Sequence, residues 1–375
     1  KTMKKIILLV MLCFGSLSFL MAQSESGSPQ TFGTNKFMLT GNGEAVFTAD
    51  SGTANFTAVN FKPIFLWKLS DKLFIESEVE IETGDGVADL GLEYVNMCYI
   101  VNPYLALHMG RFLPKFGAYR GKLGEAYINR FATNPIGFGD GGIGPMDEVG
   151  VGAQGGVPLG TAKMNYDLWV SNGPQVGKDE ATGESAPGSF DYEAYTDNNK
   201  NKALGGRIGI LPFSNSSLEL GFSYETAQKT GDSYSPFEDV SLNMMAVDLN
   251  YFHTIKAIKS TVRLIGEWKM QDEKYPAVDP IASYKSSSST FYGTISIRPS
   301  LLQNKFFRNL EVAYRYSQFD LTKVKFDNEP AGLSKPDRMA VALDYWFKWN
   351  CVLKVMWQKE KDVTNQYLVQ MVYGF

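Results

Sequence analysis

The strongest constraint on the fold is an alternation of apolar and polar side chains that returns in one short segment after another. A clear example is the segment 218–225, in which Leu218, Leu220, Phe222 and Tyr224 alternate with Glu219, Gly221, Ser223 and Glu225. Successive side chains of a strand point to opposite faces, so this spacing predicts a strand with one apolar and one polar face.

Sixteen segments of the chain carry this pattern. They lie near 37–48, 55–69, 72–83, 90–101, 104–113, 149–157, 163–172, 203–211, 217–227, 241–253, 260–271, 290–298, 309–319, 338–347, 351–359 and 365–375. This is about 22 residues for each strand with its connection, a spacing that suits membrane barrels with strands of about 10 residues. The pattern predicts an all-β protein, a 16-stranded antiparallel transmembrane β-barrel.

The connections between these segments divide into a short and a long set. The short connections are 70–71, 102–103, 158–162, 212–216, 254–259 and 348–350, and the long ones are 83–89, 114–148, 173–202, 228–240, 272–289 and 320–337. Outer-membrane barrels have short periplasmic turns and longer external loops, so we assign the short set to the periplasmic side. A soluble sheet with one wet face would explain any single strand, but it gives no reason for the sorted connections.

The first residues indicate the compartment. Lys4 and Lys5 precede an apolar run over 6–20, and the small Ala22 follows it, which predicts a signal peptide over residues 1–22. We expect residues 23–36 to be a flexible polar lead-in and residues 37–375 to form the barrel. Later segments are too often interrupted by charged residues for a membrane helix, and a closed barrel is the other structure that satisfies its backbone in lipid.

The stretch YLVQMVYGF, Tyr367–Phe375, has a continuous apolar face at odd-numbered positions. An apolar face of this length needs an apolar surface to lie against, and we expect this face to meet lipid. The aromatic end also resembles the signal that the outer-membrane assembly machinery reads.

The third external connection, 114–148, is the candidate pore constriction, because long connections in compact domains are usually functional. Its first half carries a local excess of positive charge, from Lys115, Arg120, Lys122 and Arg130 against Glu125. Residues 123–131 have helical character, whereas the glycine-rich 137–145 requires unusual backbone angles. We expect the loop to fold into the lumen; a loop folded outward over the barrel mouth is the alternative.

Side-chain parity predicts which charged strand residues face the lumen. The candidates include the basic residues Arg111, Arg207, Arg263, Arg298 and Arg315 and the acidic residues Glu76, Glu78 and Glu80. An Arg or Lys on the lipid face would cost roughly 2–4 kcal/mol at the midplane, so these charges belong on the opposite face. For each of them, a structural ion pair is the alternative to a solute contact.

The segment MGRFLPKFGAY, Met109–Tyr119, resembles the Gly-(Arg/Lys/Gln)-Phe-x-x-Pro-Phe-Gly signature of the phosphate-selective porins O and P, with Lys115 inserted after Pro114. The later segments INRFATNPIG, GPMDEVGVGAQGG and LWVSNGP are also similar to that family, including its Bacteroidota members, so the resemblance covers about 90–174. It implies a sixteen-stranded, usually trimeric diffusion channel that is constricted by its third loop.

These observations together predict an outer-membrane porin for passive diffusion of small hydrophilic solutes, with a mild anion preference set by the basic loop residues. The expected partners are small hydrophilic or anionic solutes, outer-membrane lipid and lipopolysaccharide, the assembly machinery and further copies in a homotrimer, with no nucleic acid and no cofactor. The alternative is a β-barrel subunit that acts as a binding or assembly component of a larger cell-envelope complex. An enzyme is not expected, because the two histidines, His108 and His253, are far apart in sequence.

Overall fold

The computed structural model describes residues 36–375, except for 85–86, 140, 179–182, 184, 280–282, 321–334 and 362. The predicted signal peptide and nearly all of the predicted lead-in lie outside the described residues. The chain divides into a unit of residues 1–37 and a unit Met38–Phe375, and the strands of the described residues lie in the second unit, apart from Phe37.

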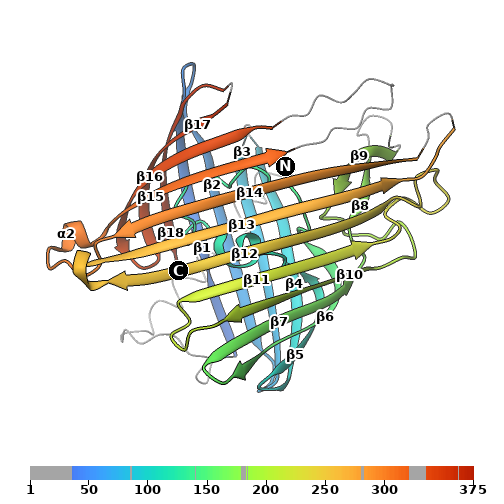
Figure 1. The fold of residues 1–375 in the computed structure, drawn as a ribbon, viewed down its shortest axis with the longest axis horizontal. Helices are drawn as coiled ribbons and strands as arrows, with labels where there is room; N and C mark the ends of the chain where they lie inside the picture. Colours follow the sequence, from blue (N-terminus) through green and yellow to red (C-terminus); the bar gives the residue numbers. More distant parts are fainter. Residues whose placement is uncertain are drawn as a thin grey trace, which may run out of the picture. The chain divides into compact units, whose positions relative to one another are not determined.

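Sixteen antiparallel strands close into a barrel, in the spatial order β1-β18-β17-β16-β15-β14-β13-β12-β11-β10-β7-β6-β5-β4-β3-β2 (Figure 1). Their bounds are β1 Phe37–Ala49, β2 Ala54–Lys68, β3 Leu73–Gly84, β4 Val87–Asn102, β5 Leu105–Phe112, β6 Glu148–Leu159, β7 Ala162–Ser171, β10 Ala203–Leu211, β11 Leu218–Ala227, β12 Ser241–Ile255, β13 Ser260–Tyr275, β14 Tyr284–Arg298, β15 Leu310–Asp320, β16 Asp337–Lys348, β17 Cys351–Glu360 and β18 Gln366–Gly374. Each predicted segment corresponds to one of these strands, so the predicted 16-stranded barrel is confirmed.

The connection 172–202 contains a hairpin that the alternation does not predict. Its strands β8 (Gln175–Lys178) and β9 (Ser185–Asp191) form a separate two-stranded sheet. The remaining elements among the described residues are short: η2 (Tyr119–Leu123), η3 (Lys256–Ile258) and α2 (Lys305–Arg308). Among the described residues, no helix is long and apolar enough to cross a membrane.

The predicted long connection 83–89 is wrong. Strand β3 continues to Gly84 and β4 begins at Val87, and these two residues pair with each other. The added pairs are Glu82 with Asp89, Thr83 with Ala88 and Gly84 with Val87, and they do not alternate between apolar and polar residues. Strands that extend beyond the apolar band need no apolar face, so the alternation ends before the pairing does. For the same reason β14 begins at Tyr284, which shortens the predicted connection 272–289.

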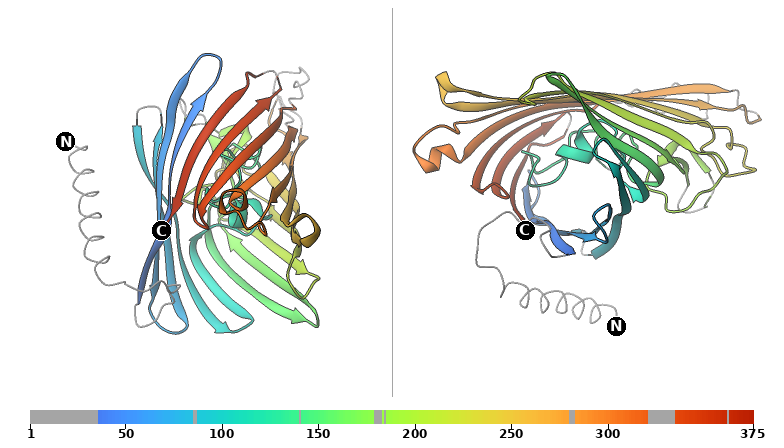
Figure 2. Two further views of the ribbon diagram at one scale, coloured as in Figure 1. Left: turned by 90° about the vertical axis from the view of Figure 1, so that its left-hand side faces the viewer. Right: turned by 90° about the horizontal axis from the view of Figure 1, so that it is seen from below.

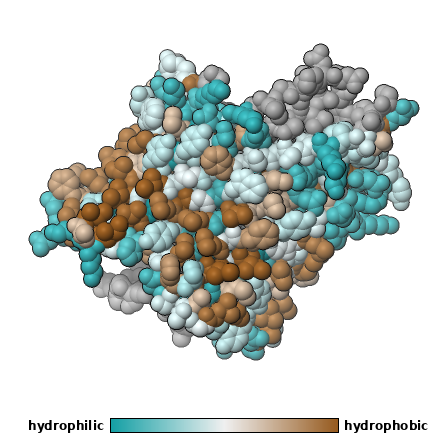
Figure 3. Space-filling view, in the orientation of Figure 1, coloured by the Kyte–Doolittle hydropathy of each residue, from teal (hydrophilic) through white to brown (hydrophobic). Residues whose placement is uncertain are grey.

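The outer surface of the barrel is apolar and its inner face is polar, as β13 illustrates. Leu264 and Trp268 are exposed, whereas Glu267 and Lys269 on the opposite face are 3% and 1% exposed. Apolar side chains form a band across the strands, and hydrophilic ones gather at the strand ends (Figure 3). A continuous exposed apolar band on a closed barrel is the surface that lipid requires.

The first and last strands of the barrel pair with each other and close it. Their register runs from Asn42 opposite Gly374 to Ala49 opposite Tyr367. Phe375 extends the seam, because its N–H donates to the Gly41 carbonyl at 3.0 Å and its ring stacks on Phe61. In β18, Tyr367 and Val369 are exposed whereas Leu368 is buried, as the odd-numbered apolar face predicts.

Candidate functional site

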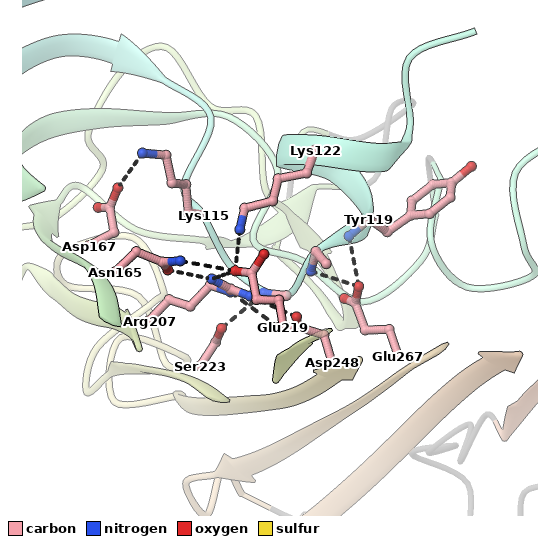
Figure 4. A network of polar contacts seen from close by, with 12 residues as sticks. Lys115, Tyr119, Lys122, Asn165, Asp167, Arg207, Glu219, Ser223, Asp248 and Glu267 are labelled. Atoms are coloured by element: carbon pink, nitrogen blue, oxygen red, sulfur yellow. Dashed lines mark hydrogen bonds and ion pairs between the residues drawn. The ribbon is translucent and has the colours of Figure 1, made fainter. Parts of the chain in front are cut away.

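The long connection 113–147 packs against the inward face of the strands. The N–H groups of Ala118 and Tyr119 donate to Glu267 Oε2 at 2.8 and 2.7 Å, and the Gly117 N–H donates to Ser223 Oγ at 3.0 Å (Figure 4). Seen end-on, the turquoise segment that holds η2 lies within the ring of strands (Figure 2). Phe116 is 1% exposed, so this part of the connection is closely packed.

A glycine is required where this connection meets β13. Gly117 has φ +69°, and a Cβ there would lie 1.9 Å from Glu267 Oε1. Only glycine allows the backbone to approach this carboxylate in that conformation. The expected unusual angles over 137–145 are confirmed by positive φ at Gly137 and Gly141.

The predicted helix over 123–131 is wrong, because the helical turn η2 ends at Leu123 and turns and bends follow it. Cations of the wall bind backbone carbonyls of this part of the connection, and that of Ala126 is one that a helix over 123–131 would use internally. Lys354 Nζ donates to the Ala126 carbonyl at 2.6 Å, and Arg315 Nη1 donates to the Thr133 carbonyl at 2.7 Å. These two cations tie the connection to β17 and β15.

Three of the basic residues of the connection lie against carboxylates of the wall. The ion pairs are Lys115 with Asp167 at 3.3 Å, Lys122 with Glu219, and Arg130 with Glu311 at 3.2 Å (Figure 4 shows the first two). Lys115 also donates to Gln154. The positive charges that the sequence places in this connection are therefore largely neutralised by the strands behind it.

Arg120 and Arg111 share one carboxylate. Each guanidinium reaches Asp147 Oδ2, at 3.2 Å from Arg120 and 3.3 Å from Arg111. Arg120 also lies 3.7 Å from Glu93 and 3.6 Å from Glu193. Burial raises the pKa of Asp147 to about 6, although the nearby Arg120 and Arg111 favour its charged form.

The remaining predicted lumen arginines line the inward side of β10 and β13–β15. Arg207 is 2% exposed and contacts Asp248 at 2.7 Å and Glu219 at 3.1 Å. Arg298 lies over the Trp346 ring, on which Arg130 also lies. Arg263 stands in register with Ser296, whose hydroxyl donates to Glu311 at 2.6 Å. The structure thus brings these arginines to the wall that carries the connection.

The predicted acidic residues of β3 lie on the other side. Glu78 and Glu80 are 4% and 7% exposed and border a cavity of about 550 Å³ between the strands β1–β4 and the connection. Glu125 reaches this cavity from the connection and accepts from Asn42 Nδ2 at 3.0 Å. Glu76 borders a second cavity of about 190 Å³, together with Lys115 and His108.

Three carboxylates of the larger cavity are missed by the sequence analysis: Glu44, Glu93 and Glu193. The alternation of side chains along β1 places Glu44 on the inward face, so the sequence could have identified it. Glu93 stands at a bulge, where the pairing shifts between Glu78 opposite Tyr94 and Val79 opposite Leu92, so parity cannot be carried through it. Glu193 belongs to the connection 172–202, to which alternation assigns no position.

An apolar hollow of about 710 Å³ lies on the outward face, over β4–β7 and β10. Exposed side chains such as Met97, Met109 and Leu168 line it, and they belong to the apolar band. Its chemistry suits lipid or another apolar surface and not a hydrophilic solute.

Comparison with solved structures identifies the fold. The chain resembles OmpF of Salmonella typhi in complex with daunomycin (11% identity, 90% of this chain and 97% of that chain, TM-score 0.57) and the outer membrane channel DcaP of Acinetobacter baumannii (13%, 90% and 97%, 0.56). It also resembles the anion-selective porin from Comamonas acidovorans (12%, 90% and 99%, 0.52). No protein-family model and no curated protein matches the chain. At these identities the likeness establishes the fold, which is that of bacterial outer-membrane porins.

Proposed function

We propose that this protein is an outer-membrane porin that passes small hydrophilic solutes by passive diffusion. The observation that carries the proposal is the contrast between the two faces of the closed barrel. Its outside is apolar, whereas its inside holds charged side chains around a cavity of about 550 Å³ beside the connection 113–147. The fold shared with outer-membrane channels supports the same reading.

The connection 113–147 is the proposed constriction. A constriction has to keep its shape against the flow of solute, and this one is tied to the wall from several strands. Glu267 holds the amides of Ala118 and Tyr119, and Lys354 holds the carbonyl of Ala126. Buried charge-assisted hydrogen bonds of this kind are strong and directional.

Membership of the porin O and P family is a finer proposal, which rests on the motif Met109–Tyr119 and concerns the constriction and not the ion selectivity of the channel. The motif residues Phe116 and Gly117 support a structural role for it, because they sit at the contact with β11 and β13. A homotrimer, contacts with lipopolysaccharide and recognition of the C-terminal strand by the assembly machinery belong to the same proposal.

The mild anion preference expected from the loop depends on free positive charge at Arg120, Lys122 and Arg130. Each of these residues has a carboxylate partner within 4 Å. Their pairing weakens the basis of that expectation, and the sign of the ion preference then depends on the residues that line the cavity.

The test of the proposed function is conductance of the purified protein in planar lipid bilayers. We expect stepwise insertion events, each of which adds a fixed ohmic conductance. Deletion of residues 118–136, which removes the centre of the proposed constriction, should raise the conductance of each step. Folded, heat-modifiable protein that inserts without conducting would contradict the proposal and favour the alternative, a barrel that serves as a component of a larger envelope complex.

A further inference from the structure

The cavity beside the constriction has a one-sided charge. Among the described residues that line it, the carboxylates are Glu44, Glu78, Glu80, Glu82, Glu93, Glu125 and Glu193, and the cations are Lys62 and Arg120. Seven carboxylates thus face two cations. The carboxylates come from strands β1, β3 and β4, from the constriction and from the connection 172–202, so they surround the space from several sides.

The other basic residues of the constriction do not offset this charge. Lys115, Lys122 and Arg130 are directed to Asp167, Glu219 and Glu311, on β7, β11 and β15, and none of these three basic residues belongs to the lining. The two cations that do line the cavity are also engaged. Lys62 pairs with Glu80, and Arg120 contacts Glu93, Asp147 and Glu193.

A buried acceptor at the same wall points to a ligand that donates. Gln370 on β18 is 3% exposed and lines the cavity. Its Nε2 donates to Glu44, whereas its Oε1 has no hydrogen-bond partner among the described residues. An unsatisfied buried acceptor costs free energy, and a hydrated cation or an ammonium group is a partner that would satisfy it.

We infer that this cavity makes the channel prefer cationic solutes, from monovalent metal ions to small organic ammonium compounds. The inference rests on the proposed function, because it names the solute class of the same passage. Local charges in a narrow, low-dielectric passage govern which ions enter it, and rings of Asp or Glu favour cations. The basic residues of the constriction fasten it to the wall, and the acidic wall opposite sets the sign of the selectivity.

The reversal potential of the wild-type channel across a potassium chloride gradient tests this inference. We expect a ratio of potassium to chloride permeability above one. The variant Glu78→Gln with Glu82→Gln replaces two lining carboxyl groups by amides with little change in shape, and its permeability ratio should fall toward one. The matched control, Asp71→Asn with Asp239→Asn, removes two exposed carboxylates outside the strands, and its ratio should stay at the wild-type value.

The outcomes separate the two proposals. A conducting wild type with a permeability ratio at or below one overturns the inference and leaves the porin function intact. A cation-selective wild type whose ratio survives Glu78→Gln with Glu82→Gln also overturns it, because the charge would then lie elsewhere. Absence of conductance in all folded variants would instead contradict the proposed function. If the double variant does not fold, the sign of the wild-type reversal potential still decides the inference.

Discussion

The two sides of the lumen use the same residue types for different purposes. On the side of β7 and β10–β17, acidic and basic side chains pair with each other and with the backbone of the constriction, as with Arg207 and Asp248. On the side of β1–β4, carboxylates such as Glu78 and Glu82 face the cavity in excess over cations. A charge in a barrel lumen can therefore either hold a loop or set the electric field in the passage, depending on the groups with which it pairs.

The largest expected effect comes from breaking a buried pair on the first side. Arg207→Ala removes both guanidinium contacts from Asp248, which is 1% exposed, and should destabilise the barrel by roughly 3–5 kcal/mol. A urea titration of the protein in lipid vesicles, followed by tryptophan fluorescence, measures the free energy of unfolding. Lys62→Ala on the acidic side is the matched variant, and a loss as large as that of Arg207→Ala would erase the distinction between the two sides.

A smaller effect is expected where a carboxylate holds the constriction. Glu267→Ala leaves the N–H groups of Ala118 and Tyr119 without their acceptor, which should cost roughly 1–3 kcal/mol. The loosened constriction should make single-channel current noisier and larger. Glu267→Gln keeps an acceptor oxygen and should retain quiet, wild-type currents. Equal recordings from both variants would show that Glu267 does not hold the loop.

The smallest expected effect depends on pH. Because burial raises the pKa of Asp147 to about 6, this carboxyl gains its proton as the pH falls through about 6. Protonation removes the negative charge of Asp147, with which Arg111 and Arg120 pair, so the region beside Glu93 and Glu193 becomes more positive. Burial also raises the pKa of Glu125, which acts in the same direction.

Cation preference should therefore weaken between pH 8 and pH 5, as measured by the reversal potential in a potassium chloride gradient. Asp147→Asn should show a smaller pH dependence than the wild type. A preference that strengthens on acidification would mean that these carboxylates do not act on the passage.

The strands could be predicted from the sequence because lipid and lumen impose opposite demands on alternate residues. In β13, Leu264 and Glu267 show this contrast directly. The bulge next to Glu93 could not be predicted. Its extra residue reverses which side chains of the strand face the lumen, and no residue type in the sequence indicates its position. The hairpin of β8 and β9 is a separate two-stranded sheet and not part of the barrel wall, so the contrast between lipid and lumen does not mark its residues.

The candidate site was predictable in part of its members, since Glu44, Glu93 and Glu193 were missed, and it was not predictable in its pairing. Parity and loop position identify Lys122, Arg130 and Glu78 as inward charges, and the structure places all three inside the barrel. Which carboxylate meets which cation depends on contacts between residues far apart in sequence, such as Arg130 and Glu311. From the basic residues of the loop, the sequence predicts a positively charged passage. The residues that line the cavity lead us to infer an acidic passage instead.

The seam between β1 and β18 has a consequence for the order of events during folding. It joins residues as distant as Thr40 and Phe375, 335 positions apart, so no shorter piece of the ring can make this contact. Until the seam forms, the sheet has two open edges whose N–H and C=O groups lack partners. Lipid offers these groups no hydrogen bonds, whereas water does. Ring closure and entry into the bilayer therefore have to proceed together, and a chain arrested before closure would be left at the membrane surface with both edges open.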